Sequence, residues 1–107
     1  MNIKFLQNNE GDDWDVGDTI RIETVVEENQ AFSDTFTKSD PESIKITITG
    51  YNSNIVVNSQ TMDMDGTGEY YFNWDTSGLA PGDYEIEITA SKNGTSETDD
   101  EWIRLTD

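Results

Sequence analysis

The chain has 107 residues, no cysteine and no histidine, and its 23 acidic and 6 basic side chains give a formal net charge of −17 at pH 7. This length suits one domain. The missing cysteines exclude disulfides and thiolate chemistry, and the missing histidines remove the usual proton shuttle near neutral pH. The negative charge argues against nucleic-acid binding, which needs a basic surface.

The hydropathy pattern shows no segment that would cross a membrane or direct secretion. No apolar run is long enough to cross a bilayer, and the first residues lack the basic segment and apolar stretch of a secretory signal. We therefore expect no membrane partner and no signal peptide.

The acid excess has two interpretations. At molar salt the Debye length falls to about 3 Å, which screens self-repulsion on an acidic surface. Alternatively, the acids form a binding patch for basic partners or cations. The acids run from Glu10 to Asp107 with few gaps, and this even spread favours adaptation to brine.

The N-terminal part predicts two strands separated by polar loops. Residues 1–15 are expected to form an edge strand near 3–6 and a flexible loop, and a second strand is expected at 19–26. The long connection over 27–42 holds Phe32 and Phe36. These two rings either tuck under the domain or contact a partner.

The middle of the chain alternates apolar and polar residues, which is typical of half-buried strands. Strands are expected at 43–49, 55–58 and 69–75, and a turn is expected at 63–68. The following side chains are predicted to point inward: Ile44, Ile46, Ile48, Met62, Tyr70, Phe72 and Trp74.

The C-terminal part holds the clearest fold signal. Pro81-Gly82 predicts a turn, and Tyr84 then opens a strand that alternates to Ala90. This arrangement is similar to the tyrosine corner of immunoglobulin-like sandwiches, in which the hydroxyl bonds to backbone upstream. Asn93-Gly94 predicts a hairpin turn, and the last strand ends at 102–105.

These elements predict an all-β, immunoglobulin-like antiparallel β-sandwich of 7–8 strands over residues 1–107. The absence of a repeat at fixed period indicates one module. Three residues are expected to have structural roles: Trp74, Gly82 and Tyr84.

Carboxylates offer only partial signals for chemistry. Asp63-x-Asp65-Gly66 resembles the middle of a calcium loop, but the first ligand position holds Thr61 and the bidentate position holds Phe72. Asp63, Asp65 and Glu69 could form an improvised cation site, and a solvated hairpin turn is the alternative. A second group of acidic residues could likewise bind a cation or simply be solvated. Its members are Asp12, Asp13, Asp15 and Asp18. The sequence shows no group of catalytic residues and no phosphate-binding loop. We therefore expect that the protein is not an enzyme and binds no cofactor.

Surface contacts are assigned to large or charged side chains outside the predicted core. Trp102 ranks first because exposed tryptophans are enriched at interface hot spots. Asn93-Gly94-Thr95 is also a glycosylation sequon, although the hairpin alone explains Asn-Gly. The interface candidates are Trp14, Phe32, Phe36, Trp102 and Arg104.

Four motifs in order resemble a known family. Gly17-Asp18-Thr19, Asp40-Pro41-Glu42-Ser43, Gly68-Glu69-Tyr70-Tyr71 and Pro81-Gly82-Asp83-Tyr84 are similar to those of small immunoglobulin-like structural proteins of tailed viruses that infect haloarchaea and bacteria. The resemblance implies a non-enzymatic virion component of the head, neck or tail. It would be assembled in the host cytoplasm and would bind other virion proteins or copies of itself.

The alternative is a cell-surface adhesion or carbohydrate-binding module. Its stacking platform would use one or more aromatic side chains: Trp14, Phe32, Tyr51 or Trp102. This hypothesis predicts export, whereas the virion hypothesis does not.

Overall fold

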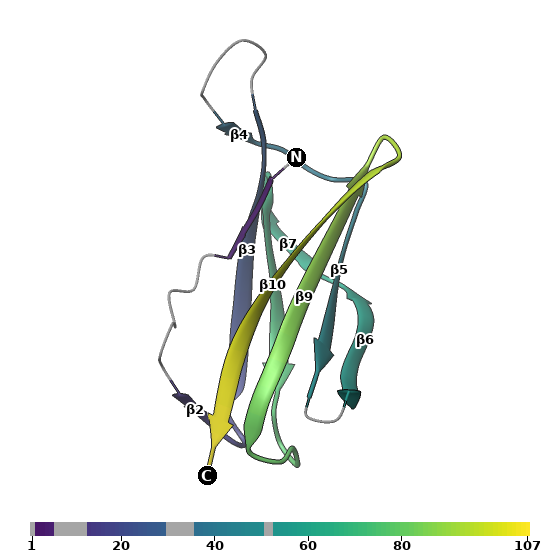
Figure 1. The fold of residues 1–107 in the computed structure, drawn as a ribbon. Coiled ribbons are helices and arrows are strands. Elements are labelled where there is room, and N and C mark those ends of the chain that lie inside the picture. Colours follow the sequence, from purple (N-terminus) through teal and green to yellow (C-terminus); the bar gives the residue numbers. More distant parts are fainter. Residues whose placement is uncertain (1, 6–12, 30–35, 51–52) are drawn as a thin grey trace.

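The computed structural model describes residues 2–5, 13–29, 36–50 and 53–107, which form ten β-strands in two packed sheets (Figure 1). Sheet A has the order β1 (Asn2–Phe5), β3 (Thr19–Asn29), β8 (Glu69–Asp75), β7 (Asp63–Gly66), and β4 (Phe36–Lys38) pairs with the end of β3. Sheet B has the order β2 (Asp13–Asp15), β10 (Thr95–Thr106), β9 (Gly82–Lys92), β5 (Ser43–Thr49), β6 (Ile55–Thr61). The prediction of an all-β sandwich is confirmed.

Several details differ from the prediction. Strands β3 and β6 continue three residues past the predicted ends at 26 and 58, to Asn29 and Thr61. The ten strands exceed the expected 7–8 because β2, β4 and β7, with three or four residues each, lie where loops and turns were expected. Such short strands show too little alternation to be recognised. The pairing is also not wholly antiparallel, because β2 runs parallel to the end of β10.

The core lies between the sheets and is filled by alternate residues of the long strands. Trp74 and Tyr84 connect the sheets through an edge-to-face contact, with ring centroids 5.4 Å apart and ring planes at 64°. Met62 is buried where the chain passes from β6 in sheet B to β7 in sheet A. Phe72 is only half-buried and packs against this core. The buried apolar side chains of the central strands are Ile20, Ile22, Val25, Val26, Ile44, Ile46, Ile48, Tyr70, Trp74, Tyr84, Ile86, Ile88 and Ala90.

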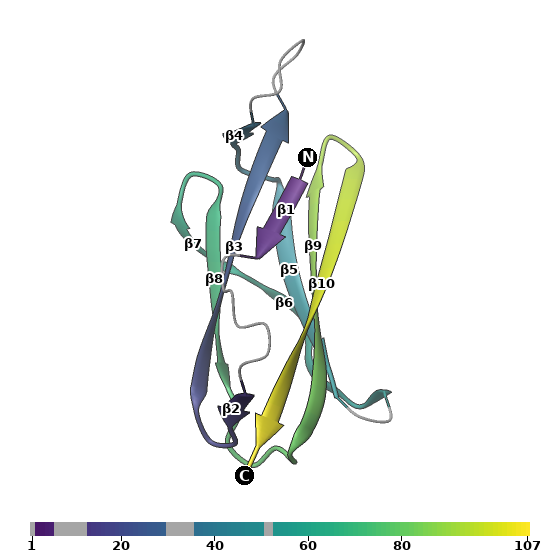
Figure 2. The same cartoon turned by 60° about the vertical axis from the view of Figure 1, so that its left-hand side comes forward.

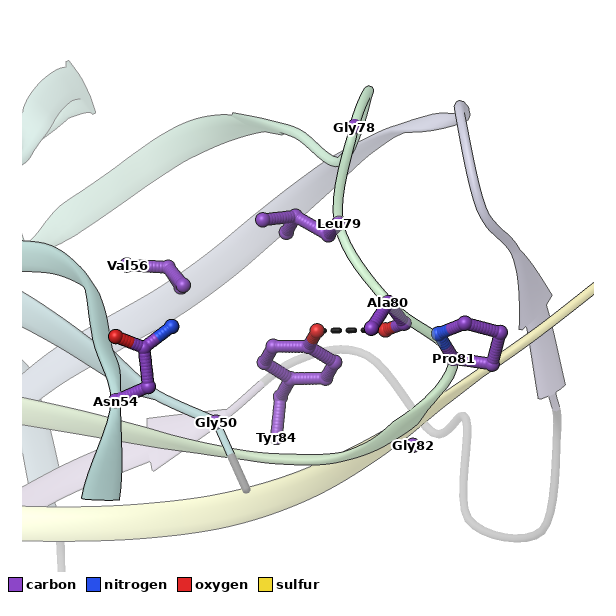
Figure 3. Close-up of a pocket in the computed structure, with 9 residues that line it drawn as sticks. All are labelled: Gly50, Asn54, Val56, Gly78, Leu79, Ala80, Pro81, Gly82 and Tyr84. Atoms are coloured by element: carbon purple, nitrogen blue, oxygen red, sulfur yellow. Dashed lines mark hydrogen bonds between the residues drawn. The ribbon is translucent and has the colours of Figure 1, made fainter. Parts of the chain in front are cut away.

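The crossing from sheet A to sheet B at the β8–β9 connection is fixed by Tyr84. Its hydroxyl donates to the carbonyl oxygen of Ala80 at 2.6 Å (Figure 3). Gly82 follows the turn with φ 147°. A Cβ on Gly50 would lie 2.8 Å from Cε1 of Tyr84, so the ring also requires glycine at the start of the β5–β6 connection.

The sandwich is elongated, with extents of 48 × 25 × 22 Å. The β9–β10 hairpin turn lies at one end, and the C-terminus and the β8–β9 connection lie at the other (Figure 1). Figure 2 shows the two sheets facing each other along this length. Within the described residues, no helix has the length and apolar character to cross a membrane.

Candidate functional site

The outer face of sheet B is the candidate site. Alternation on β9 buries Tyr84, Ile86 and Ile88, so the intervening residues turn away from the core. Directly paired residues of neighbouring strands share a face, and the register extends this face across β10 and β5. The outer face comprises Ser43, Lys45, Thr47, Thr49, Glu85, Glu87, Thr89, Ser91, Ser96, Thr98, Asp100 and Trp102.

One row of this face has a tryptophan at its end. Trp102 of β10 pairs with Glu85 of β9, and Glu85 pairs with Thr49 of β5. The Trp102 side chain is 62% exposed, and Ile55, which pairs with Thr49 from β6, is 55% exposed. The row therefore places two solvent-exposed apolar side chains on either side of a carboxylate and a hydroxyl.

The rows nearer the hairpin are lined by hydroxyl groups. The Oγ1 atoms of Thr89 and Thr98 lie 3.0 Å apart, and the Oγ atoms of Ser91 and Ser96 lie 2.8 Å apart. These cross-strand hydrogen bonds hold the side chains in fixed positions. Between them and β6 lies a shallow hollow of about 300 Å³, lined by Ser43, Lys45, Thr47, Ser59, Glu87, Thr89 and Ser91.

Two carboxylates lie next to Trp102 on this face: Glu85 is its cross-strand partner, and Asp100 lies two residues away on β10. A hydrogen bond with Asp100 raises the pKa of Glu85 above its ordinary value, and partial burial and repulsion from Asp100 and Glu87 raise it further. Trp102 and Asp100 are two residues apart on β10, so both point to this face. The site is thus acidic and rich in hydrogen-bond acceptors and hydroxyls.

A second hollow, of about 390 Å³, lies beside Tyr84 at the β8–β9 connection (Figure 3). It separates the β8–β9 connection, with Leu79 and Ala80, from Asn54 and Val56. The Tyr84 hydroxyl in its wall already donates to Ala80. This hollow follows from the packing of two connections, and the hydroxyl proton of Tyr84 is already engaged by Ala80.

The structure does not bring the predicted cation ligands together. Asp65 forms an ion pair with Arg21 at 3.2 Å, and Glu69 forms one with Lys38 at 2.9 Å. Asp63, expected to lie in the turn, begins β7. Asp12 lies outside the described residues, as does the side chain of Asp13. In the part of the chain that the structure describes, no three acidic side chains are grouped to hold a metal ion.

The remaining interface candidates lie at different places. Trp14 in β2 is half-buried and packs against the core. Arg104 is exposed next to Trp102 on β10, and its Nε lies 3.0 Å from the carboxylate of Asp83. Phe32 lies outside the described residues, and only the backbone of Phe36 is described, at the start of β4. Of the five candidates, Trp102 and Arg104 lie together.

The sequence analysis placed Trp102 outward but did not assign the hydroxyl rows. A signal was present, because Ser43, Lys45 and Thr47 alternate with buried isoleucines, as Thr89 and Ser91 do with Ile88 and Ala90. Pairing these two runs into one face required the β5–β9 register, which the sequence does not specify.

No family model matches the chain, and no curated protein matches it. Among solved structures, the chain is similar to an endo-β-1,4-mannanase from Thermotoga petrophila, with a TM-score of 0.60 and 16% sequence identity. The similarity covers 99% of this chain and 20% of the mannanase chain. At this identity it indicates a shared fold, and the chain spans about a fifth of the length of the enzyme it matches.

This comparison corrects the predicted function. The expectation of a virion component of the head, neck or tail is wrong, because the fold is similar to part of an endo-β-1,4-mannanase and not to a virus protein. The four motifs that suggested that family consist of turn and strand-start residues such as Gly17-Asp18 and Pro81-Gly82. Such residues are found at the turns of any β-sandwich, so they do not identify a viral structural protein.

Proposed function

We propose that this chain is a non-catalytic β-sandwich module that binds a polysaccharide on the outer face of sheet B, with Trp102 as its stacking platform. The observation that supports this most directly is the 62% exposure of Trp102 on a sheet face whose other side chains on β5, β9 and β10 are polar. An exposed tryptophan of this kind is costly to hydrate and is typical of recognition surfaces.

Sugar rings have an apolar face and a rim of hydroxyl groups, and the outer face offers a partner for each. The indole of Trp102 provides a flat apolar surface. Glu85 and Asp100 next to it accept hydrogen bonds from hydroxyls, and charge-assisted bonds of this kind are stronger than neutral ones. The rows containing Thr89 and Thr98 extend the polar surface along the sheet, as a chain-like ligand requires.

The similarity to a mannanase is consistent with this proposal. That protein is a glycoside hydrolase, and modules that bind polysaccharide are useful beside such enzymes because they raise the effective substrate concentration. The similarity covers a fifth of the enzyme, so we transfer the sugar-binding context to this chain and not the hydrolytic activity.

The arrangement of the carboxylates supports binding without hydrolysis. Glycosidases place two carboxyl groups about 5–10 Å apart on either side of the scissile bond. Glu85 and Asp100 instead point to the same side of one open sheet face, since Glu85 pairs with Trp102 and Asp100 lies two residues before Trp102 on β10. Such a pair cannot enclose a glycosidic bond between an acid and a nucleophile.

The strand order supports an immunoglobulin-like form of the sandwich. In that fold one sheet has the order ABED and the other contains G, F and C, with C′ added in variable-type domains. Strands β1-β3-β8-β7 and β10-β9-β5-β6 occupy corresponding positions when lettered along the chain. The Tyr84 hydrogen bond at the β8–β9 connection matches the corner at the E–F connection.

The acidic surface supports a high-salt environment for this module. All described carboxylate side chains are at least partly exposed, and the chain has 17 more acidic than basic residues. Molar salt would screen the resulting repulsion.

Calorimetric titration with soluble β-1,4-mannan, xylan and a cellulose derivative tests the proposal. We expect one of these to bind, and we expect Trp102→Ala to weaken binding at least tenfold, which is about 1.4 kcal/mol. The matched control is Met64→Ala, because Met64 is 56% exposed on β7 of the other sheet. Binding of none of the polysaccharides, or equal binding by both variants, would overturn the proposal.

Light scattering separates a protein interface from a sugar site. If Trp102→Ala dissociates a dimer or a higher oligomer of the wild-type protein, the exposed indole serves self-association and the sugar-binding proposal is wrong. We expect both proteins to scatter as monomers.

A further inference from the structure

The β9–β10 hairpin has a feature that its turn geometry leaves unexplained. Asn93-Gly94-Thr95 is an Asn-x-Thr sequon, and no other asparagine of the chain is followed at the second position by serine or threonine. Asn93 and Gly94 adopt φ 53° and 78°, as a two-residue hairpin loop of this type requires. The turn geometry explains why Asn93 and Gly94 are present, but it does not require threonine at position 95.

We propose that Asn93 is an N-glycosylation site. Asn93 and Thr95 are both exposed, and a Cβ built on Gly94 would have no atom within 4 Å. The backbone N–H of Asn93 donates to the side chain of Glu42, which anchors the turn through its main chain. Among the described residues, no hydrogen bond engages the Asn93 amide or the Thr95 hydroxyl, so both recognition groups are accessible in the folded protein.

The reaction uses a lipid-linked sugar phosphate as the donor. The Nδ2 atom of Asn93 forms a bond to the anomeric carbon of the donor sugar, and the bond from that carbon to the phosphate oxygen breaks. The lipid phosphate leaves with the bonding electrons, and a base of the transferase takes the proton from Nδ2. Because such transferases act outside the cytoplasm, the proposal also requires export of the chain.

The position of Asn93 keeps a glycan away from the outer face. The hairpin turn lies at the end of the sandwich opposite the C-terminus (Figure 1). Trp102 lies seven residue steps after Thr95 on β10, which corresponds to about 23 Å along a strand. A glycan at the turn therefore leaves the Trp102 row open, and the glycosylation site does not depend on the sugar-binding proposal.

Intact-mass spectrometry of the full chain purified from its native cells tests the site. We expect a mass above the 12.1 kDa of the unmodified chain, with the excess on the peptide that contains Asn93. The excess should be lost in Asn93→Asp and Thr95→Ala and retained in Thr95→Ser. Asp also tolerates positive φ, so the first variant keeps the turn, which circular dichroism verifies. The unmodified mass, or an excess that persists in Thr95→Ala, would overturn the proposal.

Discussion

Gly68 lies so close to Val26 that a Cβ at position 68 would be 2.7 Å from the Val26 carbonyl oxygen. The two residues are also hydrogen-bonded, because the Val26 N–H donates to the Gly68 carbonyl at 2.8 Å. The Gly68 N–H donates to Oδ1 of Asp40 at 2.7 Å. Three segments that are distant in the sequence therefore meet at a residue without a side chain.

Replacing Gly68 with Ala should destabilise the protein by about 2–5 kcal/mol, because positive φ is strained for alanine and the methyl group displaces packed backbone. The measurement is the free energy of unfolding from a urea titration. Gly94→Ala is the control, since Gly94 has similar φ but open space around it, and should cost about 1–2 kcal/mol. Equal costs for the two variants would show that the close packing at Gly68 is unimportant.

Replacing Tyr84 with Phe tests the hydrogen bond that fixes the β8–β9 connection. The variant keeps the ring against Trp74 but leaves the Ala80 carbonyl without its 2.6 Å donor. We expect a loss of about 0.5–1.5 kcal/mol in the free energy of unfolding. Tyr71→Phe is the matched control, because Arg21 stacks over the Tyr71 ring at 3.9 Å and this contact survives. A loss for Tyr84→Phe no larger than for the control would mean that the bond contributes nothing.

The sequence predicts two of the seven-residue strands in full, because their alternation and the turn residues that flank them are both visible in it. Strands β5 (Ser43–Thr49) and β8 (Glu69–Asp75) begin and end where the alternation predicts. Their inward residues are large and apolar, and the flanking residues are turn formers. Burial of each such side chain stabilises the fold by about 1.5–3 kcal/mol, which leaves the register little freedom.

Elements whose structure depends on a neighbour are not predictable in this way. The segment Asp63–Gly66 resembles a turn, yet it forms β7 because the edge of β8 offers hydrogen-bond partners. On β10, Asp99 and Glu101 pair with Ile88 and Ile86, at positions where alternation would require apolar residues. Both acids stay partly exposed, and inward-pointing charges near a sheet edge oppose pairing with another chain.

The candidate site was predictable only in part for the same reason. Trp102 follows from the alternation of its own strand, so the sequence places it outward. The rows that combine Trp102 with Glu85 and Thr49 arise from the pairing of three strands. That pairing depends on the whole sandwich and has no local signature.

Salt should raise the stability of this protein. Increasing KCl from 0.1 to 1 M shortens the Debye length from about 10 to about 3 Å and screens repulsion arising from a net charge of −17. The ion pairs found among the described residues join charges at 2.5–3.2 Å, so salt weakens these attractions less than it weakens the repulsion between distant carboxylates. We expect Tm to rise with KCl in thermal unfolding scans. A Tm that falls or stays constant would contradict adaptation to brine.

Glu85, which pairs with Trp102, should make the stability of the protein depend on pH. The hydrogen bond with Asp100 and the nearby charges raise the pKa of Glu85 from 4.5, so the folded protein holds this proton more tightly than the unfolded chain. Stability from this group is then present below pH 4.5 and is lost as the pH rises through the raised pKa. Glu85→Gln removes this loss, so its Tm should exceed the wild-type value at pH 7 and match it near pH 4. Glu97→Gln, the control, removes the same charge near the hairpin turn and should give a smaller gain, whereas equal gains for the two variants would assign the effect to net charge alone.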